Sequence, residues 1–330
     1  MKKLIILTLV LTTIAFVSGC TSETPAAGIP VAPLAEPQPA QQTAAPDPSA
    51  GIDTQPVNDG ESGNDGNDRF AASFARELSV HFIDVGQADS ILVMLPNGEN
   101  MLIDGGEARN ASDILSYLHS HDVTAIDYLV ASHPHADHIG GLPAIIDAME
   151  VHSIFMPRVS HTTVTFERFL TSIQNKGLLI DQALAGVSIL SLPGLDVDIA
   201  APVREDYRDH NDHSAVIKIT FGSTSFLFMG DAEGTSESHI TGDISADVLK
   251  VGHHGSRTST TADFLSRVAP SYAVISVGAT NSYGHPTDEV LARLYNANVE
   301  VYRTDIAGTI IFTSDGENIF IDKTPSPYSP

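Results

Sequence analysis

Cysteine and basic residues are both scarce in this 330-residue sequence. The single cysteine, Cys20, excludes an internal disulfide. Lysine and arginine number 17 against 41 aspartate and glutamate residues, which sets the formal net charge at -24. Such an acidic chain is unsuited to non-specific binding of nucleic acid or anionic membrane, because both carry phosphate charge. A nuclease is still compatible with this charge, since bound metal ions present local positive charge inside an acidic protein.

Two common functional motifs are also missing. The sequence has no Gly-x-x-x-x-Gly-Lys loop and no Gly-x-Ser-x-Gly turn. The first motif binds nucleotide phosphates and the second carries the nucleophile of many serine hydrolases. The sequence therefore offers neither of these two sites, and the candidate chemistry has to come from other residues.

The N-terminus has the features of an export signal. A short basic start at residues 1–3 precedes an almost wholly apolar run over 4–16, and Val-Ser-Gly-Cys follows at 17–20. The run is too short for a comfortable transmembrane helix, which needs about 20 apolar residues. Its ending resembles a lipoprotein lipobox, in which the cysteine is lipidated. We therefore expect a signal peptide over 1–20, lipidation of Cys20 and attachment to the outer face of the cell membrane. An ordinary secretory signal and a retained membrane anchor are the alternatives.

Composition divides the rest of the chain. Residues 21–76 are rich in Pro, Ala, Gly, Ser, Thr, Asn and Asp and have almost no large apolar side chains. Such a segment cannot bury enough surface to offset its chain entropy. We predict a disordered tether there, a globular domain over 77–323 and a C-terminal tail over 324–330. A domain of about 250 residues is long enough to form one sizeable core.

Strand-like and helix-like segments alternate through the predicted domain. This alternation predicts two sheets covered by outer helices, a four-layer αββα sandwich of the α/β class. The predicted helices cover 112–120, 235–240, 261–268 and 289–295, with a further helix after Gly140-Gly141. The predicted strands cover 80–85, 90–95, 100–104, 126–131, 154–155, 187–192, 197–200, 216–221, 225–229, 248–251, 272–277, 299–302, 309–313 and 318–321.

Four potential metal ligands fall within six residues, directly after the strand at 126–131. They are His133, His135, Asp137 and His138. In a loop at a strand end these side chains can splay around one point, and imidazole nitrogen with carboxylate oxygen suits zinc and neighbouring divalent metals. The two alternating histidines can serve one ion and the Asp-His pair a second.

Two further strand ends carry ionisable groups. The apolar run 226–229 leads to Asp231, and the run 248–251 leads to His253 and His254. Asp231 is placed to bridge two ions about 3.5–4 Å apart, an arrangement that supplies hydroxide as a nucleophile at neutral pH. The three strand ends together predict a two-metal active site.

These motifs resemble the metallo-β-lactamase superfamily and, within it, the soluble domain of the competence protein ComEC and its free-standing relatives. The resemblance spans roughly residues 78–322. It rests on the stretches 82–90, 102–106, 132–141, 228–231, 250–256 and 281–286. It implies the metallo-β-lactamase sandwich and a hydrolase with two bound metal ions.

The resemblance also implies two ligand sets. One of His253 and His254 joins the second ion, and we favour His254, with His253 as a catalytic or substrate-contacting neighbour. The other assignments are His133 and His135 for the first ion, Asp137 and His138 for the second, and Asp231 as the bridge. Asp137, His253 and His285 are the expected catalytic residues.

The third ligand of the first ion is expected on the loop before the strand that leads to Asp231. Counted back from Ser214, His210 occupies the position that many superfamily members give to this ligand. We rank His210 first, with His213 and Asn211 as alternatives, because the ComEC branch often lacks this histidine. If none of them binds, the first ion would be weakly held.

Several neighbours are expected to support the site. Asp84 and Asp104 either accept hydrogen bonds from ligand imidazoles or cap loops. Ser256 and Arg257 could contact a substrate phosphate, and the planar fork of Arg257 matches phosphate geometry.

The loop that carries Tyr283 and His285 is the last candidate segment. The resemblance makes His285 an active-site donor, and Tyr283 lies two residues before it as a candidate substrate contact. The remaining histidines are expected to be structural or at the surface: His81, His119, His121, His152, His161 and His239.

We therefore expect a metal-dependent hydrolase with two zinc ions, or manganese in their place. Phosphodiesters are the favoured substrates, because ComEC-like domains are associated with DNA degradation at the cell surface and similar exported esterases act on phosphorylcholine of cell-wall polymers. The acidic charge favours a short nucleic acid or a cell-envelope polymer over a long nucleic-acid footprint. The alternatives are a metal-dependent amide, lactone or β-lactam hydrolase, and a non-catalytic surface protein with structural metals. The sequence gives no indication of the oligomeric state.

Overall fold

The computed structural model describes residues 76–327. The predicted signal peptide, Cys20 and the predicted tether up to residue 75 lie outside the described residues, as do the last three residues of the predicted tail. None of the helices within 76–327 combines the length and the apolar character that crossing a bilayer demands.

The strands of the described region form two mixed sheets. The first has the order β15-β14-β1-β2-β3-β4-β5-β6 and the second the order β13-β12-β11-β10-β9-β8-β7. The first sheet contains β1 (Leu78–Phe82), β2 (Ile91–Met94), β3 (Asn100–Ile103), β4 (Ala125–Val130), β5 (Glu150–Met156), β6 (Ile180–Gln182), β14 (Ile310–Ser314) and β15 (Ile319–Ile321). The second contains β7 (Ser188–Leu192), β8 (Leu195–Ala201), β9 (Val216–Phe221), β10 (Thr224–Phe228), β11 (Val248–Lys250), β12 (Tyr272–Ile275) and β13 (Glu300–Arg303).

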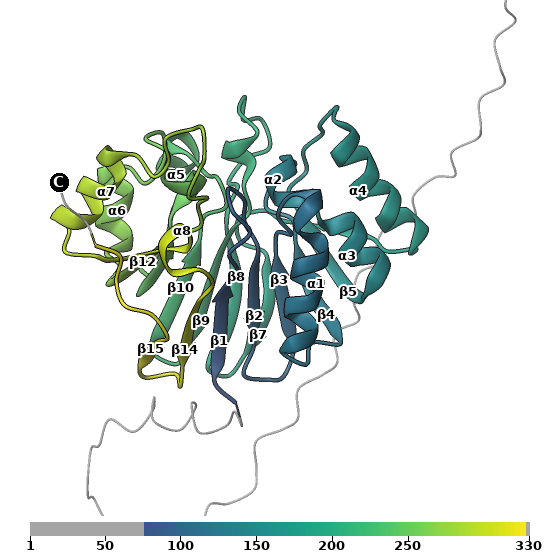
Figure 1. Ribbon diagram of the computed structural model, residues 1–330, viewed down its shortest axis with the longest axis horizontal. Coiled ribbons are helices and arrows are strands. Elements are labelled where there is room, and N and C mark those ends of the chain that lie inside the picture. Colours follow the sequence, from purple (N-terminus) through teal and green to yellow (C-terminus); the bar gives the residue numbers. More distant parts are fainter. Residues whose placement is uncertain (1–75, 328–330) are drawn as a thin grey trace, which may run out of the picture. The chain divides into compact units, whose positions relative to one another are not determined.

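Helices cover the outer face of each sheet. In Figure 1, α1, α3 and α4 lie at the right and α6 and α7 at the left, with the strands between them. The helices are α1 (Ala111–Ser120), α2 (Ala136–Ile139), α3 (Leu142–Ala148), α4 (Val164–Asn175), α5 (Gly234–His239), α6 (Ala262–Val268), α7 (Asp288–Asn296) and α8 (Thr304–Ala307), with the 3₁₀ turns η2 (Ala108–Asn110), η3 (Asn211–His213) and η4 (Gly252–Gly255).

Three apolar layers hold this arrangement together. One lies between the two sheets, where Phe82 contacts Phe228 and Phe312 at ring-centroid distances of 6.1 and 5.9 Å. A second joins the first sheet to α1, α3 and α4, and a third joins the second sheet to α6 and α7. The predicted four-layer αββα sandwich is therefore confirmed.

The parallel part of each sheet positions the candidate ligands. Strands β3 to β6 run parallel in the first sheet, and β10 to β13 run parallel in the second. The carboxyl ends of parallel strands share one edge of a sheet, where ligands commonly bind. The loops after β3 and β4 therefore meet at one edge, and those after β10, β11 and β12 meet at another.

Close backbone packing fixes the loop that follows β4. The Gly105 amide donates to the His138 carbonyl at 2.7 Å, and the Gly141 amide donates to the Gly106 carbonyl at 3.0 Å. A Cβ atom at Gly141 would lie 2.2 Å from the Gly105 oxygen, closer than any real contact. The pairs Gly105-Gly106 and Gly140-Gly141 are thus required for this close approach. It holds the loop after β4, which carries the predicted metal ligands, against the end of β3.

Helix α4 is the main element that the sequence-based prediction did not include. Its buried residues Phe166, Phe169 and Ile173 recur with helical spacing, and the Thr163 hydroxyl accepts a hydrogen bond from the Phe166 amide as an N-terminal cap. Both signals are present in the sequence. The predicted strand at 154–155 is likewise only part of β5.

His81 makes folding stability depend on pH. Burial, assisted by the nearby His121 and opposed by Asp322, lowers its pKa from 6.5 to about 4. The unfolded chain then binds a proton between pH 6.5 and 4 that the folded chain does not, so stability is lost as the pH falls through this window. We expect this residue to account for at most about 3 kcal/mol of the loss.

The variant His81→Gln tests this. Gln can still bond Ser79 and Tyr117, which contact the two ring nitrogens at 2.8 Å each. The free energy of unfolding of the metal-free protein is measured in urea at pH 7 and at pH 4.5. The wild type should lose more of it than the variant over this range, so the difference between the two proteins should narrow or change sign. Parallel pH profiles for the two proteins would contradict this role.

Candidate metal centre

Loops from both sheets converge on one cavity of about 360 Å³. The loop after β4 leads into α2, β10 is followed by Asp231, and β11 is followed by η4 with its two histidines. The cavity is lined by Gln87, His135, Ala136, Asp137, His161, Thr163, Asn211, Asp231, His253, His254, Tyr283 and His285. Three strand ends that are distant in sequence therefore build a single site.

The Asp231 carboxylate is buried at the centre of this site. Its Oδ1 atom lies 3.2 Å from His138 Nε2 and 3.7 Å from His254 Nε2. Asp137 Oδ2 lies 3.3 Å from the same His254 nitrogen and 3.8 Å from His138 Nε2. Asp137, His138, Asp231 and His254 each offer one ligand atom within 4.8 Å of the others, so they form one candidate metal site.

The outer nitrogens of these imidazoles are anchored. His138 Nδ1 donates to Asp104 Oδ2 at 2.7 Å, and His254 Nδ1 donates to the Ser276 carbonyl at 2.9 Å. Asp104 also accepts hydrogen bonds from the amide and hydroxyl of Ser132 at 2.7 and 2.6 Å. These contacts orient each ring and leave Nε2 as the free ligand atom, the usual arrangement of metal-binding histidines. Of the two roles predicted for Asp104, the structure shows the hydrogen bond to a candidate ligand.

The inner atoms of the site lack partners among the described residues. His138 Nε2 and Asp231 Oδ1 are buried, 3.2 Å apart, and make no hydrogen bond. Two lone pairs that face each other in this way repel unless a positive charge lies between them. Burial opposes protonation of His138, but the carboxylates of Asp231, Asp104 and Asp137 outweigh it and raise the His138 pKa well above its usual value. The donor set and this demand for positive charge both fit a divalent cation.

The second oxygen of Asp231 faces another pair of histidines. Asp231 Oδ2 lies 3.9 Å from His133 Nε2 and 3.7 Å from His253 Nε2. His133 Nε2 in turn lies 2.9 Å from His135 Nδ1. Burial, with the charge of His138, lowers the His133 pKa well below its usual value, so this imidazole is neutral and can act as a ligand.

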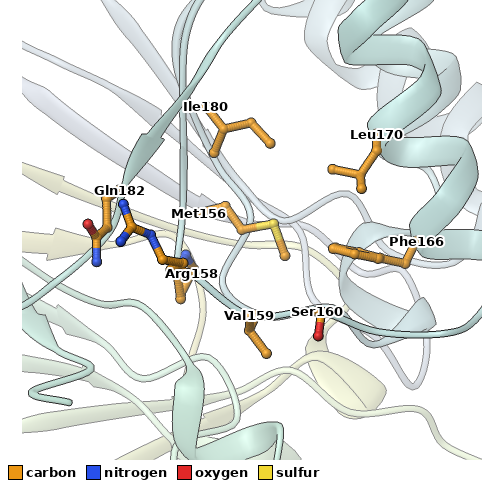
Figure 2. Close-up of a pocket in the computed structure, with 9 residues that line it drawn as sticks. Met156, Arg158, Val159, Ser160, Phe166, Leu170, Ile180 and Gln182 are labelled. Carbon is orange, nitrogen blue, oxygen red and sulfur yellow. The ribbon is translucent and has the colours of Figure 1, made fainter. Parts of the chain in front are cut away.

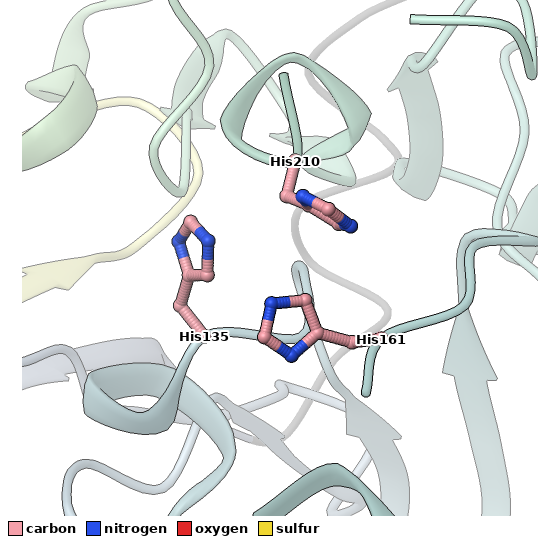
Figure 3. Close-up of side chains that lie close together, drawn as sticks. All are labelled: His135, His161 and His210. Atoms are coloured by element: carbon pink, nitrogen blue, oxygen red, sulfur yellow. The ribbon is translucent and has the colours of Figure 1, made fainter. Parts of the chain in front are cut away.

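His135 also belongs to a cluster of three histidines. His135, His161 and His210 offer nitrogen atoms within 4.8 Å of one another, and Figure 3 shows the three rings facing a shared space. The ring centroids of His161 and His210 are 4.7 Å apart. His161 was expected to be structural or at the surface, and its sequence neighbours give no signal for this placement.

The other candidates on the loop before β9 behave differently. His213 is buried, with its Nε2 atom 3.1 Å from the Tyr207 carbonyl oxygen. Asn211 lines the metal cavity, and its Nδ2 atom donates to Glu233 Oε1 at 3.2 Å. His210 thus joins the three-histidine cluster, while Asn211 reaches the site around Asp231.

A buried ion pair that the sequence-based prediction missed lies beside the site. Lys250 and Asp89 are both buried, and the Lys250 ammonium contacts Asp89 Oδ2 and donates to the Gly230 carbonyl at 3.2 Å. Asp89 Oδ1 lies 3.5 Å from His254 Nδ1. A lysine inside the otherwise apolar strand β11 was the available signal, because a buried lysine needs a charged partner.

The predicted substrate contacts divide into two groups. Tyr283 and His285 line the cavity, and their rings stack with centroids 5.7 Å apart. Ser256 is buried and contacts the Thr258 hydroxyl at 2.8 Å, whereas Arg257 is exposed, and neither lines the cavity. Their roles in substrate binding stay predictions.

The segment that leads to His161 also lines an apolar hollow. Its volume is about 550 Å³, and Met156, Phe166, Leu170 and Ile180 are among the residues that line it (Figure 2). The same hollow is lined by residues 157–160, which lead directly to His161 at the metal cavity. Consecutive residues of the segment after β5 therefore line two different cavities.

Comparison with known proteins agrees with the geometry. The model of the metallo-beta-lactamase superfamily matches residues 83–279. The chain is 30% identical over 254 residues to ComE operon protein 3 of Bacillus subtilis, covering 71% of this chain and 33% of the relative. It is 30% identical over 257 residues to Recombination protein 2 of Haemophilus influenzae, covering 76% and 31%. The chain thus spans about a third of the length of these curated relatives.

Among solved structures, the metallo-beta-lactamase fold protein YhfI from Bacillus subtilis has a TM-score of 0.45 and 13% identity, covering 68% of this chain and 96% of that chain. Together, the family match and the buried His/Asp cluster indicate a metal-dependent hydrolase. The chain belongs to the metallo-β-lactamase superfamily and is homologous to the ComEC-like competence proteins.

Proposed function

We propose that this protein is a two-metal hydrolase of phosphodiesters. The observation that carries the proposal is the position of Asp231, whose two carboxylate oxygens each face two imidazole nitrogens at 3.2 to 3.9 Å. One buried carboxylate between two sets of neutral or anionic ligands is the arrangement that a pair of divalent ions requires.

The residues around Asp231 determine which ions would bind. Asp137, His138 and His254 would hold one ion, and His133 and His135 would contribute to the other. Imidazole and carboxylate ligands favour zinc, with manganese as the alternative. When bound, the ions would polarise the phosphoryl group, stabilise charge on the attacking and leaving oxygens, and provide the nucleophile at neutral pH.

The volume of the cavity and the net charge of the chain both favour a compact substrate. A cavity of about 360 Å³ accommodates one phosphodiester with small flanking groups. The net charge of -24 disfavours a long nucleic-acid footprint. We therefore propose a short nucleic acid or a phosphodiester of a cell-envelope polymer. The relatives named for competence and recombination support the nucleic acid.

The proposed place of action is the outer face of the cell membrane. This depends on the lipobox-like ending at Cys20, which lies outside the described residues. A lipid anchor and a flexible tether would hold the hydrolase near envelope polymers and extracellular nucleic acid. Export also places the enzyme apart from the nucleic acid inside the cell.

His285 is the proposed hydrogen-bond donor to a substrate oxygen beside the metal ions. Burial, together with the charges of His253 and His254, lowers its pKa to about 4, so the imidazole is neutral at pH 7 and carries one N–H. Its Nδ1 atom is buried with no hydrogen-bond partner among the described residues. Asn281 fixes the loop, because its side chain accepts a hydrogen bond from the His285 amide at 3.0 Å and donates to the His285 carbonyl at 2.7 Å.

The double variant His133→Ala/Asp137→Ala tests the metal-dependent reaction. It removes one ligand from each side of Asp231, and the lost charge stabilisation of several kcal/mol should lower hydrolysis of bis-p-nitrophenyl phosphate at least about 1000-fold. The control His152→Ala changes a half-exposed histidine and should keep full activity. Full activity in the double variant would refute the proposal. Turnover of nitrocefin, with none of the phosphodiester, would instead indicate a carbonyl substrate.

The variant His285→Ala removes this hydrogen-bond donor. We expect kcat to fall about 100-fold, the usual cost of losing one donor that stabilises charge in the transition state, while the metal content stays that of the wild type. Tyr283→Phe keeps the aromatic stack and should change kcat only a few-fold, since the Tyr283 side chain is 70% exposed. An effect of His285→Ala on KM alone would show that this residue only binds substrate.

A further inference from the structure

We infer that His135, His161 and His210 form a third metal site, which takes a divalent ion that prefers imidazole, such as Zn²⁺. The inference goes beyond the proposed function, because the two ions proposed at Asp231 need neither His161 nor His210. Each of the three rings offers a nitrogen atom within 4.8 Å of the others. Figure 3 shows that the rings come from three segments of the chain and surround one space.

The spacing of the three rings suits a zinc ion. A Zn–N bond is about 2.0–2.1 Å long, so the nitrogens around a tetrahedral ion lie about 3.3 Å apart. Starting from separations of no more than 4.8 Å, the three nitrogens need to approach by at most about 1.5 Å. All three residues are half-buried, so the rings can turn and an ion can arrive from solvent.

One nitrogen of His161 and one of His210 are already held by the protein. His210 Nε2 lies 3.2 Å from the Ser160 carbonyl oxygen, which can only accept, so Nε2 carries the hydrogen and Nδ1 keeps its lone pair. His161 Nδ1 lies 2.8 Å from the Thr163 hydroxyl. With Nδ1 as the donor, His161 Nε2 keeps its lone pair. An imidazole held at one nitrogen and free at the other is the usual state of a metal ligand.

The fold holds these two residues together. The Thr163 hydroxyl caps α4, whose residues Phe166 and Phe169 pack in the core of the first sheet. His161 therefore lies two residues before a fixed helix start. Ser160 precedes it and holds His210, the residue before the buried turn η3. The segment after β5 thus supplies one ligand of the third site and orients another.

His135 is the ring that the third site shares with the two-metal site. Its Nδ1 atom lies 2.9 Å from His133 Nε2, on the side of Asp231, which leaves Nε2 for the three-histidine cluster. An ion on each nitrogen requires the remaining N–H proton of His135 to pass to solvent. Because this proton loss costs free energy, we expect the third ion to bind more weakly than the two ions at Asp231.

The ligand type distinguishes the third site from the two-metal site. The hydrogen bonds of His161 and His210 go to a hydroxyl and a backbone carbonyl, and neither involves a carboxylate. Imidazole alone suits Zn²⁺, Cu²⁺ and Ni²⁺, whereas carboxylate ligands suit Mn²⁺. The third site should therefore take Zn²⁺ and leave Mn²⁺ to the residues around Asp231. Three protein ligands also leave a fourth position open to water or to an anionic oxygen.

Counting bound ions tests the third site. Chelator-treated full-length protein is titrated with Zn²⁺ against a competing indicator, and the ions are counted by native mass spectrometry. In His161→Ala one ion of the wild-type complement should bind at least about 100-fold more weakly, since loss of a ligand should cost no less than loss of its supporting partner. His210→Gln should weaken the same ion. The control His152→Ala, at a half-exposed histidine, should keep the wild-type complement.

Two further measurements separate this ion from those at Asp231. Asp231→Asn and Asp231→Asn/His161→Ala should still differ by one Zn²⁺, and with Mn²⁺ the wild type and His161→Ala should bind equal numbers. Equal Zn²⁺ counts and affinities in wild type and His161→Ala would overturn the inference. A loss in His210→Gln alone, or a loss of Mn²⁺ in His161→Ala, would also overturn it by assigning the residue to the two-metal site. Failure of the two-metal proposal would instead leave His161→Ala with fewer than two ions and its one-ion difference from wild type intact.

Discussion

The buried carboxylate of Asp231 imposes the strongest constraint on this structure. A charged group removed from water is costly unless positive charge or hydrogen-bond donors compensate it. Here the compensation comes from imidazoles on both sides, and His138 Nε2 faces Asp231 Oδ1 with no hydrogen bond. Burial disfavours ionisation of Asp231, but the charge of His138 and His254 outweighs it and holds the Asp231 pKa well below its usual value. The carboxylate therefore stays ionised and ready to hold cations.

The architecture serves to deliver ligands to this carboxylate from both sheets. The first sheet supplies the loop after β4, and the second supplies Asp231 and the histidines of η4. Two contacts make the junction rigid. The Gly-Gly pairs let the β4 loop approach the end of β3, and the buried pair of Lys250 and Asp89 links β11 to the segment before β2. Because these contacts lie in tightly packed regions, the ligand atoms are positioned before any ion binds.

The metal site has a buried inner part and a partly exposed mouth. Buried atoms on the Asp231 side have no access to bulk water, whereas Tyr283 and the histidines at the mouth remain partly exposed. The acidic surface and the limited cavity are the features on which the proposal of a small substrate rests. The segment after β5 lines an apolar hollow with residues 157–160 and reaches the metal cavity at His161.

The sequence by itself determined the fold class, most strands and the ligand motif, because alternating apolar patterns and the spacing of His133 to His138 are local properties. Helix α4 was missed although Phe166, Phe169 and Ile173 carry its pattern. Only the tertiary structure decided which side chains face one another in the site. Which oxygen of Asp231 faces His253 depends on the left-handed backbone angles of His253 and on its contact with Glu233. His161 lies beside His135 because the loop after β5 folds back towards the loop after β4. Neither depends on sequence spacing, since both arise from packing between segments far apart in the chain.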